Sequence, residues 1–214
     1  MTETPTTPQP GKFKLPANIV SDVFSPLLMP TYAMIAAMWL TPLCLLPVGN
    51  RVSATAGIAF ITCIIPLVFI FTMIRLGRVT DVSISDPRQR RAPYIVALLC
   101  YIGAAVFLAS LKAPLWLVVF YGAGAIVLLL NLFITAKSKI SAHTSAVGGT
   151  CALIFWLTLR GYLLFSPLVW VSVSFLMVGI MAWARLYLYR HTLGQVAAGA
   201  ALSFSVVFVA LCIL

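Results

Sequence analysis

The sequence predicts an all-α integral membrane protein, a polytopic bundle of six to seven transmembrane helices. Of its 214 residues, 62% are hydrophobic and only 8% are charged, and the mean hydropathy is +1.09. A soluble globular domain does not have this composition. The apolar residues gather in segments of about 20, the length that a helix needs to cross a bilayer core of about 30 Å. Only short polar connections separate these segments.

Residues 1–26 are expected to form an N-terminal tail, and residues 27–214 a single transmembrane domain. The tail is rich in Thr and Pro up to Gly11, a composition typical of disorder. It lacks the basic, apolar and cleavage regions of a secretory signal peptide. The stretch from Ile19 to Ser25 is expected to lie at the membrane interface.

The transmembrane domain is expected to contain seven apolar spans. In chain order they cover residues 27–48, 54–75, 93–111, 114–134, 142–159, 164–183 and 192–214. Pro30 and Pro42 interrupt the first span, and Asn50 with Arg51 is expected to form the turn after it. The first or the fifth span is alternatively re-entrant. In the fifth span, Gly148 and Gly149 are expected to allow close packing of helices.

The formal net charge is +10, and the chain has five cysteines. The basic residues fall in the gaps between the apolar spans, where they act as topology signals and as ligands of lipid headgroups. We therefore expect the membrane, and no nucleic acid, as a partner. The cysteines lie inside apolar stretches without the spacing of a metal site, and we interpret them as packing residues.

Three polar patches share one expected face of the membrane, because two spans separate each patch from the next. They consist of Arg88, Arg90 and Arg91, then Lys137, Lys139 and His143, then Arg185, Arg190 and His191. If these patches converge, guanidinium, ammonium and imidazole groups surround one cavity, which suits an anion. In a membrane the available anions are lipid phosphates and diphosphates.

The spacing inside the patches is similar to known motifs. The third patch has Arg185, five residues, His191, three residues and then Gln195, and the second has Ser141-Ala142-His143. The first ends in Arg91-Ala92-Pro93. Together they resemble the three motifs of the type 2 phosphatidic acid phosphatase (PAP2) superfamily, over about residues 81–199. The resemblance implies a PAP2-like core.

That resemblance also implies a metal-independent lipid phosphatase that needs no cofactor. In its mechanism His191 would attack the phosphorus to give a phosphohistidine, and His143 would protonate the leaving alkoxide and then activate water. The implied ligands of the substrate phosphate are Arg91, Arg185, Arg88, Ser141 and Lys139, with Arg90 and Lys137 as auxiliaries. The scarcity of Asp and Glu agrees with the lack of a Mg²⁺ site.

Gln195 is the main departure from the family pattern, which has an aspartate at this position. We expect the Gln195 carbonyl to accept a hydrogen bond from Nδ1 of His191, since the two residues are four apart on one helical face. A glutamine supplies no negative charge, which weakens transition-state stabilisation. Asp81 or Asp86 from the first polar loop is a candidate substitute. Ala184, Ala142 and Ile84 are further departures.

Two other functions stay open on the sequence alone. One is a catalytically impaired protein that binds or transports a lipid phosphate, which Gln195 favours. The other is a membrane prenyl or CDP-alcohol transferase, which would need more aspartates for Mg²⁺ than Asp81 and Asp86 provide. For a phosphatase, the sequence leaves the substrate open. A basic cavity that opens to lipid suits phosphatidate, phosphatidylglycerophosphate, a polyprenyl phosphate or diphosphate, or a phosphorylated glycolipid.

We expect the protein in a bacterial inner (cytoplasmic) membrane, with the side of the site and the oligomeric state open. Of the 14 Lys and Arg residues, only Arg51, Lys112 and Arg160 are expected opposite the polar patches. The positive-inside rule then places the patches in the cytoplasm. Half of the 14, however, belong to the expected phosphate site and so have another reason to be there.

Overall fold

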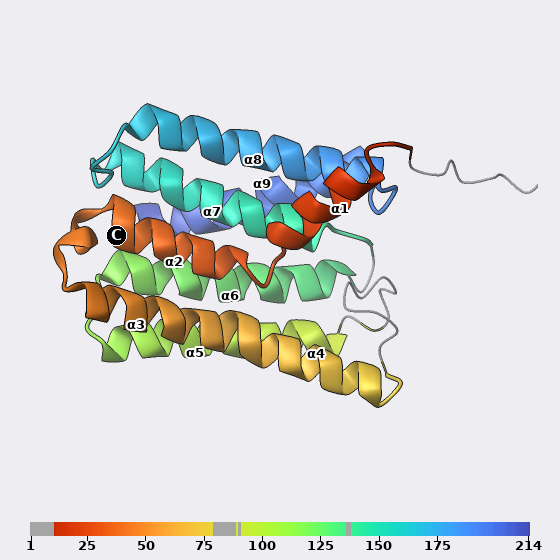
Figure 1. Ribbon diagram of the computed structural model, residues 1–214, viewed down its shortest axis with the longest axis horizontal. Helices are drawn as coiled ribbons and strands as arrows, with labels where there is room; N and C mark the ends of the chain where they lie inside the picture. The colour runs from red at the N-terminus through yellow and green to blue at the C-terminus, as the bar shows by residue number, and fades with distance from the viewer. Residues whose placement is uncertain (1–10, 79–88, 90, 136–137) are drawn as a thin grey trace, which may run out of the picture.

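A computed structural model describes residues 11–78, 89, 91–135 and 138–214, and the regular secondary structure in these ranges is helical (Figure 1). Six helices are long and apolar enough to cross a membrane. They are Val48–Arg75 (α3 Val48–Ala59, the π turn η2 Phe60–Ile64 and α4 Ile65–Arg75), α5 Arg91–Ser110, α6 Leu115–Thr135, α7 Ala142–Leu159, α8 Pro167–Tyr187 and α9 Leu193–Cys212. The predicted all-α polytopic membrane protein is confirmed.

The first expected span is wrong in its extent. Helix α2 covers only Met29–Leu40, 12 residues or about 18 Å, too short to cross a bilayer core of about 30 Å. The hydroxyl of Thr41 donates to the Ala37 carbonyl at 2.6 Å and accepts from the Leu43 N–H at 3.3 Å. It thereby ends α2 and begins the 3₁₀ turn η1 Pro42–Leu45. Hydropathy identified an apolar stretch here, but not where its helix ends.

The turn expected at Asn50 and Arg51 is also displaced. Both residues lie in the first turn of α3, which begins at Val48 directly after Pro47. Proline suits the residue before a helix because its ring fixes φ and it needs no hydrogen-bonded N–H there. The chain therefore reverses between η1 and Pro47.

Within the expected tail, residues Lys14–Val23 form helix α1, which lies against the last turns of α8 instead of continuing the axis of α2 (Figure 1). The Phe13 N–H donates to the Tyr187 hydroxyl at 3.3 Å, and the two rings meet edge to face at 6.2 Å. Leu15 and Ile19 remain exposed, as expected for an interfacial segment. Residues 1–10 lie outside the described residues.

The long helices alternate in direction, so the bundle has two distinct ends. At one, which we call the motif end, α5, α7 and α9 begin and α4, α6 and α8 finish (right in Figure 1). At the other, the core end, α2 finishes and the C-terminus lies. Arg91, Lys139 and Arg190 all lie at the motif end, as the even number of spans between the patches predicts.

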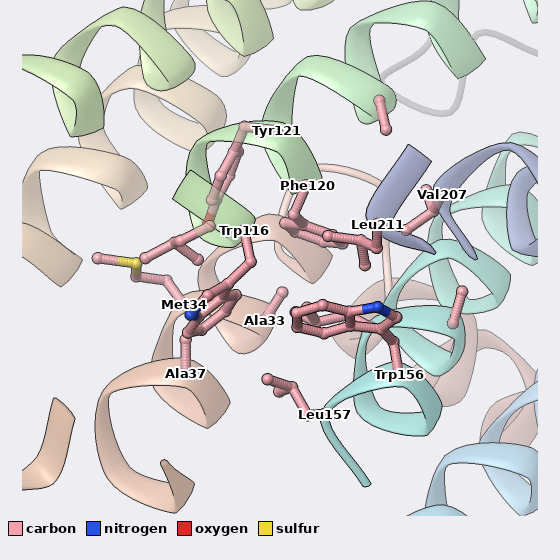
Figure 2. Packing of buried hydrophobic residues seen from close by; sticks show 14 of the residues in the cluster. Ala33, Met34, Ala37, Trp116, Phe120, Tyr121, Trp156, Leu157, Val207 and Leu211 are labelled. Atoms are coloured by element: carbon pink, nitrogen blue, oxygen red, sulfur yellow. The ribbon is translucent and has the colours of Figure 1, made fainter. Parts of the chain in front are cut away.

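The main apolar cluster lies toward the core end, because most of its residues on α5, α6, α7 and α9 come from the halves of these helices at that end. Figure 2 shows Met34 and Ala37 of α2 beside the Trp116 ring of α6, and the Trp156 ring of α7 lies 6.3 Å from that ring. The guanidinium of Arg160 lies over the Trp156 ring at 5.4 Å. α2 thus fills the bundle at this end and leaves the motif end without an equivalent helix.

Candidate functional site

The site is built on a close crossing of α7 and α9. A Cβ atom added to Gly148 would lie 2.6 Å from the Ala200 carbonyl oxygen, and one added to Gly199 would lie 2.7 Å from that of Ser141. Neither contact is possible, so these two positions require glycine for the backbones to approach. A Cβ atom added to Gly149 would lie 2.7 Å from Oγ of Ser203, so the helix-packing role expected for Gly148 and Gly149 in the fifth span is confirmed.

Hydrogen bonds join the two helices where they begin. The Thr144 hydroxyl donates to the Val196 carbonyl at 3.0 Å, and the Ser145 hydroxyl donates to the Gly199 carbonyl at 3.1 Å. His143 lies directly before these two residues. These hydrogen bonds therefore hold the start of α7, with His143, against the start of α9.

His191 is oriented by Gln195, as predicted. Its Nδ1 lies 3.1 Å from Oε1 of Gln195, and the same oxygen accepts from the Thr192 N–H at 3.3 Å. A backbone N–H can only donate, so the amide atom facing it is the oxygen, and Nδ1 of His191 must carry a proton. In a neutral imidazole the lone pair then resides on Nε2, so Nε2 is the ring nitrogen with the chemistry of a nucleophile or base.

Arg185 belongs to the last turn of α8, because that helix continues to Tyr187 and not only to the expected boundary at residue 183. It is 7% exposed, and its Nη1 donates to Oγ of Ser21 at 2.7 Å. Ser21 is itself buried, on the face of α1 that packs against α8. Helix α1 therefore covers and orients the guanidinium group.

His143, Arg185 and His191 line one cavity of about 660 Å³. Helix α1 contributes Asp22, the connection from α1 to α2 contributes Ser25 and Pro26, α5 contributes Tyr94, and α6 contributes Asn131. His143 of the second predicted patch thus meets Arg185 and His191 of the third, from α7, α8 and the turn before α9. Arg190 of the third patch does not line the cavity.

The other predicted phosphate ligands lie elsewhere. Ser141 is buried, and its Oγ caps α7 by accepting from the Thr144 N–H at 3.4 Å. Lys139 and Arg91 are exposed near the starts of α7 and α5, and neither lines the cavity. Arg88, Arg90, Lys137, Asp81 and Asp86 lie outside the described residues.

Arg185 is the group that gives the cavity an affinity for anions. Its guanidinium is buried and carries a full positive charge, and the carboxyl group of Asp22 lines the same cavity. The helix ends add little net charge, because three helices begin at the motif end and three finish there, and the partial charges of the two kinds of end have opposite signs. Two imidazole side chains beside a guanidinium can together bind a phosphate and exchange protons with it.

The sequence reasoning missed several polar residues of the cavity, namely Asp22, Ser25, Tyr94 and Asn131. Asn131 gave the clearest signal, since it is an amide inside the apolar α6 and polar residues in membrane spans tend to be functional. It is 1% exposed, and its Oδ1 has no hydrogen-bond partner within the described part of the chain. Asp22 lies in the segment expected at the interface, where hydropathy gives no reason to place it in a site.

No group of three or more His, Cys, Asp and Glu side chains within the described ranges is placed to hold a metal ion. Comparisons with protein-family models, with curated proteins and with solved structures find no match for this chain. The function is therefore inferred from the cavity itself.

Proposed function

We propose that this protein is a membrane-embedded, metal-independent phosphatase of the PAP2 type that hydrolyses a lipid phosphate or diphosphate through a phosphohistidine intermediate. The observation that carries the proposal is the convergence of His143, Arg185 and His191 on one cavity at the motif end. The hydrogen bond from His191 to Gln195 adds the tautomer that a nucleophilic Nε2 requires.

In the first step, Nε2 of His191 attacks the phosphorus, and the bond from phosphorus to the lipid oxygen breaks. His143, as the imidazolium, gives its proton to that oxygen, so that the lipid leaves as an alcohol or as the shorter phosphate. Arg185 binds non-bridging oxygens, whose negative charge is compensated by the guanidinium.

In the second step, the now neutral His143 takes a proton from water as the water oxygen attacks the phosphorus. The bond from phosphorus to Nε2 breaks, inorganic phosphate leaves, and both histidines return to their starting protonation states. No redox change occurs, and the sole co-reactant is water.

Gln195 sets the rate in this scheme. Phosphorylation of Nε2 leaves a positive charge on the His191 ring, because Nδ1 keeps its proton, and the amide oxygen stabilises this charge only as a dipole. A carboxylate would stabilise it further. We expect Gln195→Glu, which also preserves the capping arrangement with Thr192, to increase kcat about tenfold. Gln195→Met, similar in length, should lower it at least tenfold.

The test is phosphate release by the purified protein in detergent with EDTA, on a panel of lipid phosphates. Wild type should release phosphate, and both His191→Ala and His143→Ala should abolish the release. Tyr162→Phe, a change on the core end, serves as the matched control and should retain wild-type activity.

Each alternative function has its own result in this assay. If lipid phosphate binds but neither wild type nor any variant, including Gln195→Glu, releases inorganic phosphate, the protein is a binding or transport protein and not a phosphatase. Activity that appears only when Mg²⁺ replaces EDTA, with transfer to an alcohol, would indicate a transferase.

A further inference from the structure

The cavity continues from the catalytic residues far into the membrane. On α6 its lining runs from Asn131 to Phe120, eleven residues or about 16 Å along the helix axis. That distance is more than half of a bilayer core of about 30 Å. The cavity thus extends well beyond what a phosphate group alone would fill.

The deep part of the cavity is mostly apolar. Its walls come from η2, α4, α5 and α6, and α7 and α9 complete them with Gly149, Thr150, Ser203 and Val207. The lining residues there are Cys63, Pro66, Leu67, Ala97, Tyr101, Phe120, Gly124 and Val127. Side chains of this kind bind hydrocarbon and offer little to a sugar or a nucleotide.

The short α2 explains why the space exists. This helix begins only at Met29, and before it the chain turns aside so that α1 packs against α8 while α4 packs against α5 (Figure 1). The cavity is bordered by Pro26, Leu27, Leu28 and Pro30 at the start of α2, and by Pro66, Leu67 and Ile70 of α4. The half of the bilayer that a full-length α2 would occupy is therefore left to the cavity.

The volume limits what can enter. About 660 Å³ accommodates roughly 22 groups the size of a water molecule, at about 30 Å³ each. A phosphate and one chain of about 16 carbon atoms account for this space. A second chain of the same length would exceed this volume and would have to extend out of the cavity.

Resting on the phosphatase function above, we infer that the substrate is a single-chain lipid phosphate whose alkyl or prenyl chain lies inside the bundle between α4, α5 and α6. The phosphate is placed among His143, Arg185 and His191, and the buried amide of Asn131 lies between this polar region and the apolar region. Chain recognition then belongs to the deep walls of the cavity, and the bilayer contributes little to it.

The test measures chain binding without catalysis. In a His191→Ala background, native mass spectrometry gives the affinities for butyl, octyl, dodecyl and hexadecyl phosphate. Cys63→Phe places a ring in the deep part of the cavity, whereas Ile64→Phe places it on the adjacent exposed position. We expect Cys63→Phe to lower the affinity for hexadecyl phosphate at least tenfold and to leave the affinity for butyl phosphate unchanged. Ile64→Phe should change neither affinity.

A second pair keeps the test independent of how Cys63→Phe folds. Ala97 lines the cavity on α5, whereas Leu99 is 60% exposed on the same helix. Ala97 lies nearer to the polar region, so Ala97→Phe should lower the affinities for dodecyl and hexadecyl phosphate alike. Leu99→Phe should leave both affinities unchanged. Equal chain-length dependence in all variants would overturn the inference.

Turnover separates this inference from the proposed function. With wild-type protein, kcat/KM for a single-chain lipid phosphate should exceed that for a two-chain phosphatidate at least tenfold. If phosphate is released without this preference, and Cys63→Phe does not alter the affinity for long chains, the phosphatase function stands and the binding of the chain inside the bundle is excluded. Chain-length-dependent binding without phosphate release would retain the internal chain and exclude the phosphatase.

Discussion

The two ends of the bundle contain the same kinds of residue and use them differently. At the core end, Arg160 lies over the Trp156 ring among tightly packed aromatic side chains. At the motif end, Arg185 is 7% exposed, is bonded to Ser21, and lines a cavity that also contains both histidines of the chain.

This difference separates a tightly packed end of the molecule from an end with a large cavity. The core end buries its apolar side chains against one another, with α2 filling the centre of the bundle. The motif end does without that helix and loses the corresponding packing. A buried guanidinium and a large cavity cost folding free energy, and a ligand that fills the cavity is a reason for a protein to retain them.

The largest contrast is expected between the two arginines. Arg185→Met should lower kcat/KM for phosphate release on the order of 10²–10³-fold, because it removes the buried charge that binds the transferring phosphate. Arg160→Met should have little effect, since the residue lies at the opposite end. A similar loss in both variants would show that the arginines act only on folding or orientation.

A smaller contrast is expected for two leucines in thermal or denaturant unfolding in detergent. Leu157 is fully buried in the core cluster, and Leu157→Ala should cost about 2–5 kcal/mol of unfolding free energy. Leu67 borders the existing cavity, so Leu67→Ala removes few contacts and should cost less than about 1 kcal/mol. Equal costs would indicate that the motif end packs as tightly as the core end.

A third contrast concerns the crossing of α7 and α9, which holds His143 near His191. Gly199→Ala places a methyl group against the Ser141 carbonyl, whereas Gly122→Ala meets no atom within 4 Å. We expect the first to cost about 1–3 kcal/mol and to lower activity as α7 and α9 separate. The second should be neutral in both assays, and a neutral Gly199→Ala would mean that the crossing is looser than described.

The smallest effect is expected at Ser21. Ser21→Ala removes the hydrogen bond to Nη1 of Arg185 and should weaken inhibition by inorganic vanadate about tenfold, the usual value of a bond to a charged group. Ser53→Ala, an exposed serine at the core end, is the control. An unchanged inhibition constant would show that α1 covers Arg185 without orienting it.

The sequence predicts the long helices well and the cavity only in part. α7 begins and ends at the residues expected for the fifth span, because Ser141 caps it and Arg160 with Gly161 ends it. The spacing of Arg185, His191 and Gln195 also identifies residues that the fold brings together. These are local properties, read directly from neighbouring residues.

What the sequence could not give depends on contacts between distant segments. The turn of α1 onto α8 places Ser21 against Arg185, 164 residues away, and no periodicity encodes that contact. The cavity exists because α2 is short, whereas hydropathy measures an apolar stretch without showing where its helix ends. Asp22 and Asn131 enter the site for the same reason.

The most direct test of the histidine mechanism at the motif end is to trap phosphate on the enzyme. His143→Asn, given an aryl phosphate whose leaving group needs no acid, should form the phosphoenzyme and fail to hydrolyse it. Mass spectrometry of the alkali-quenched protein should then find one phosphate per chain, on His191. Hydrolysis by wild type with no phosphate on His191 in the variant would contradict the covalent mechanism at this cavity.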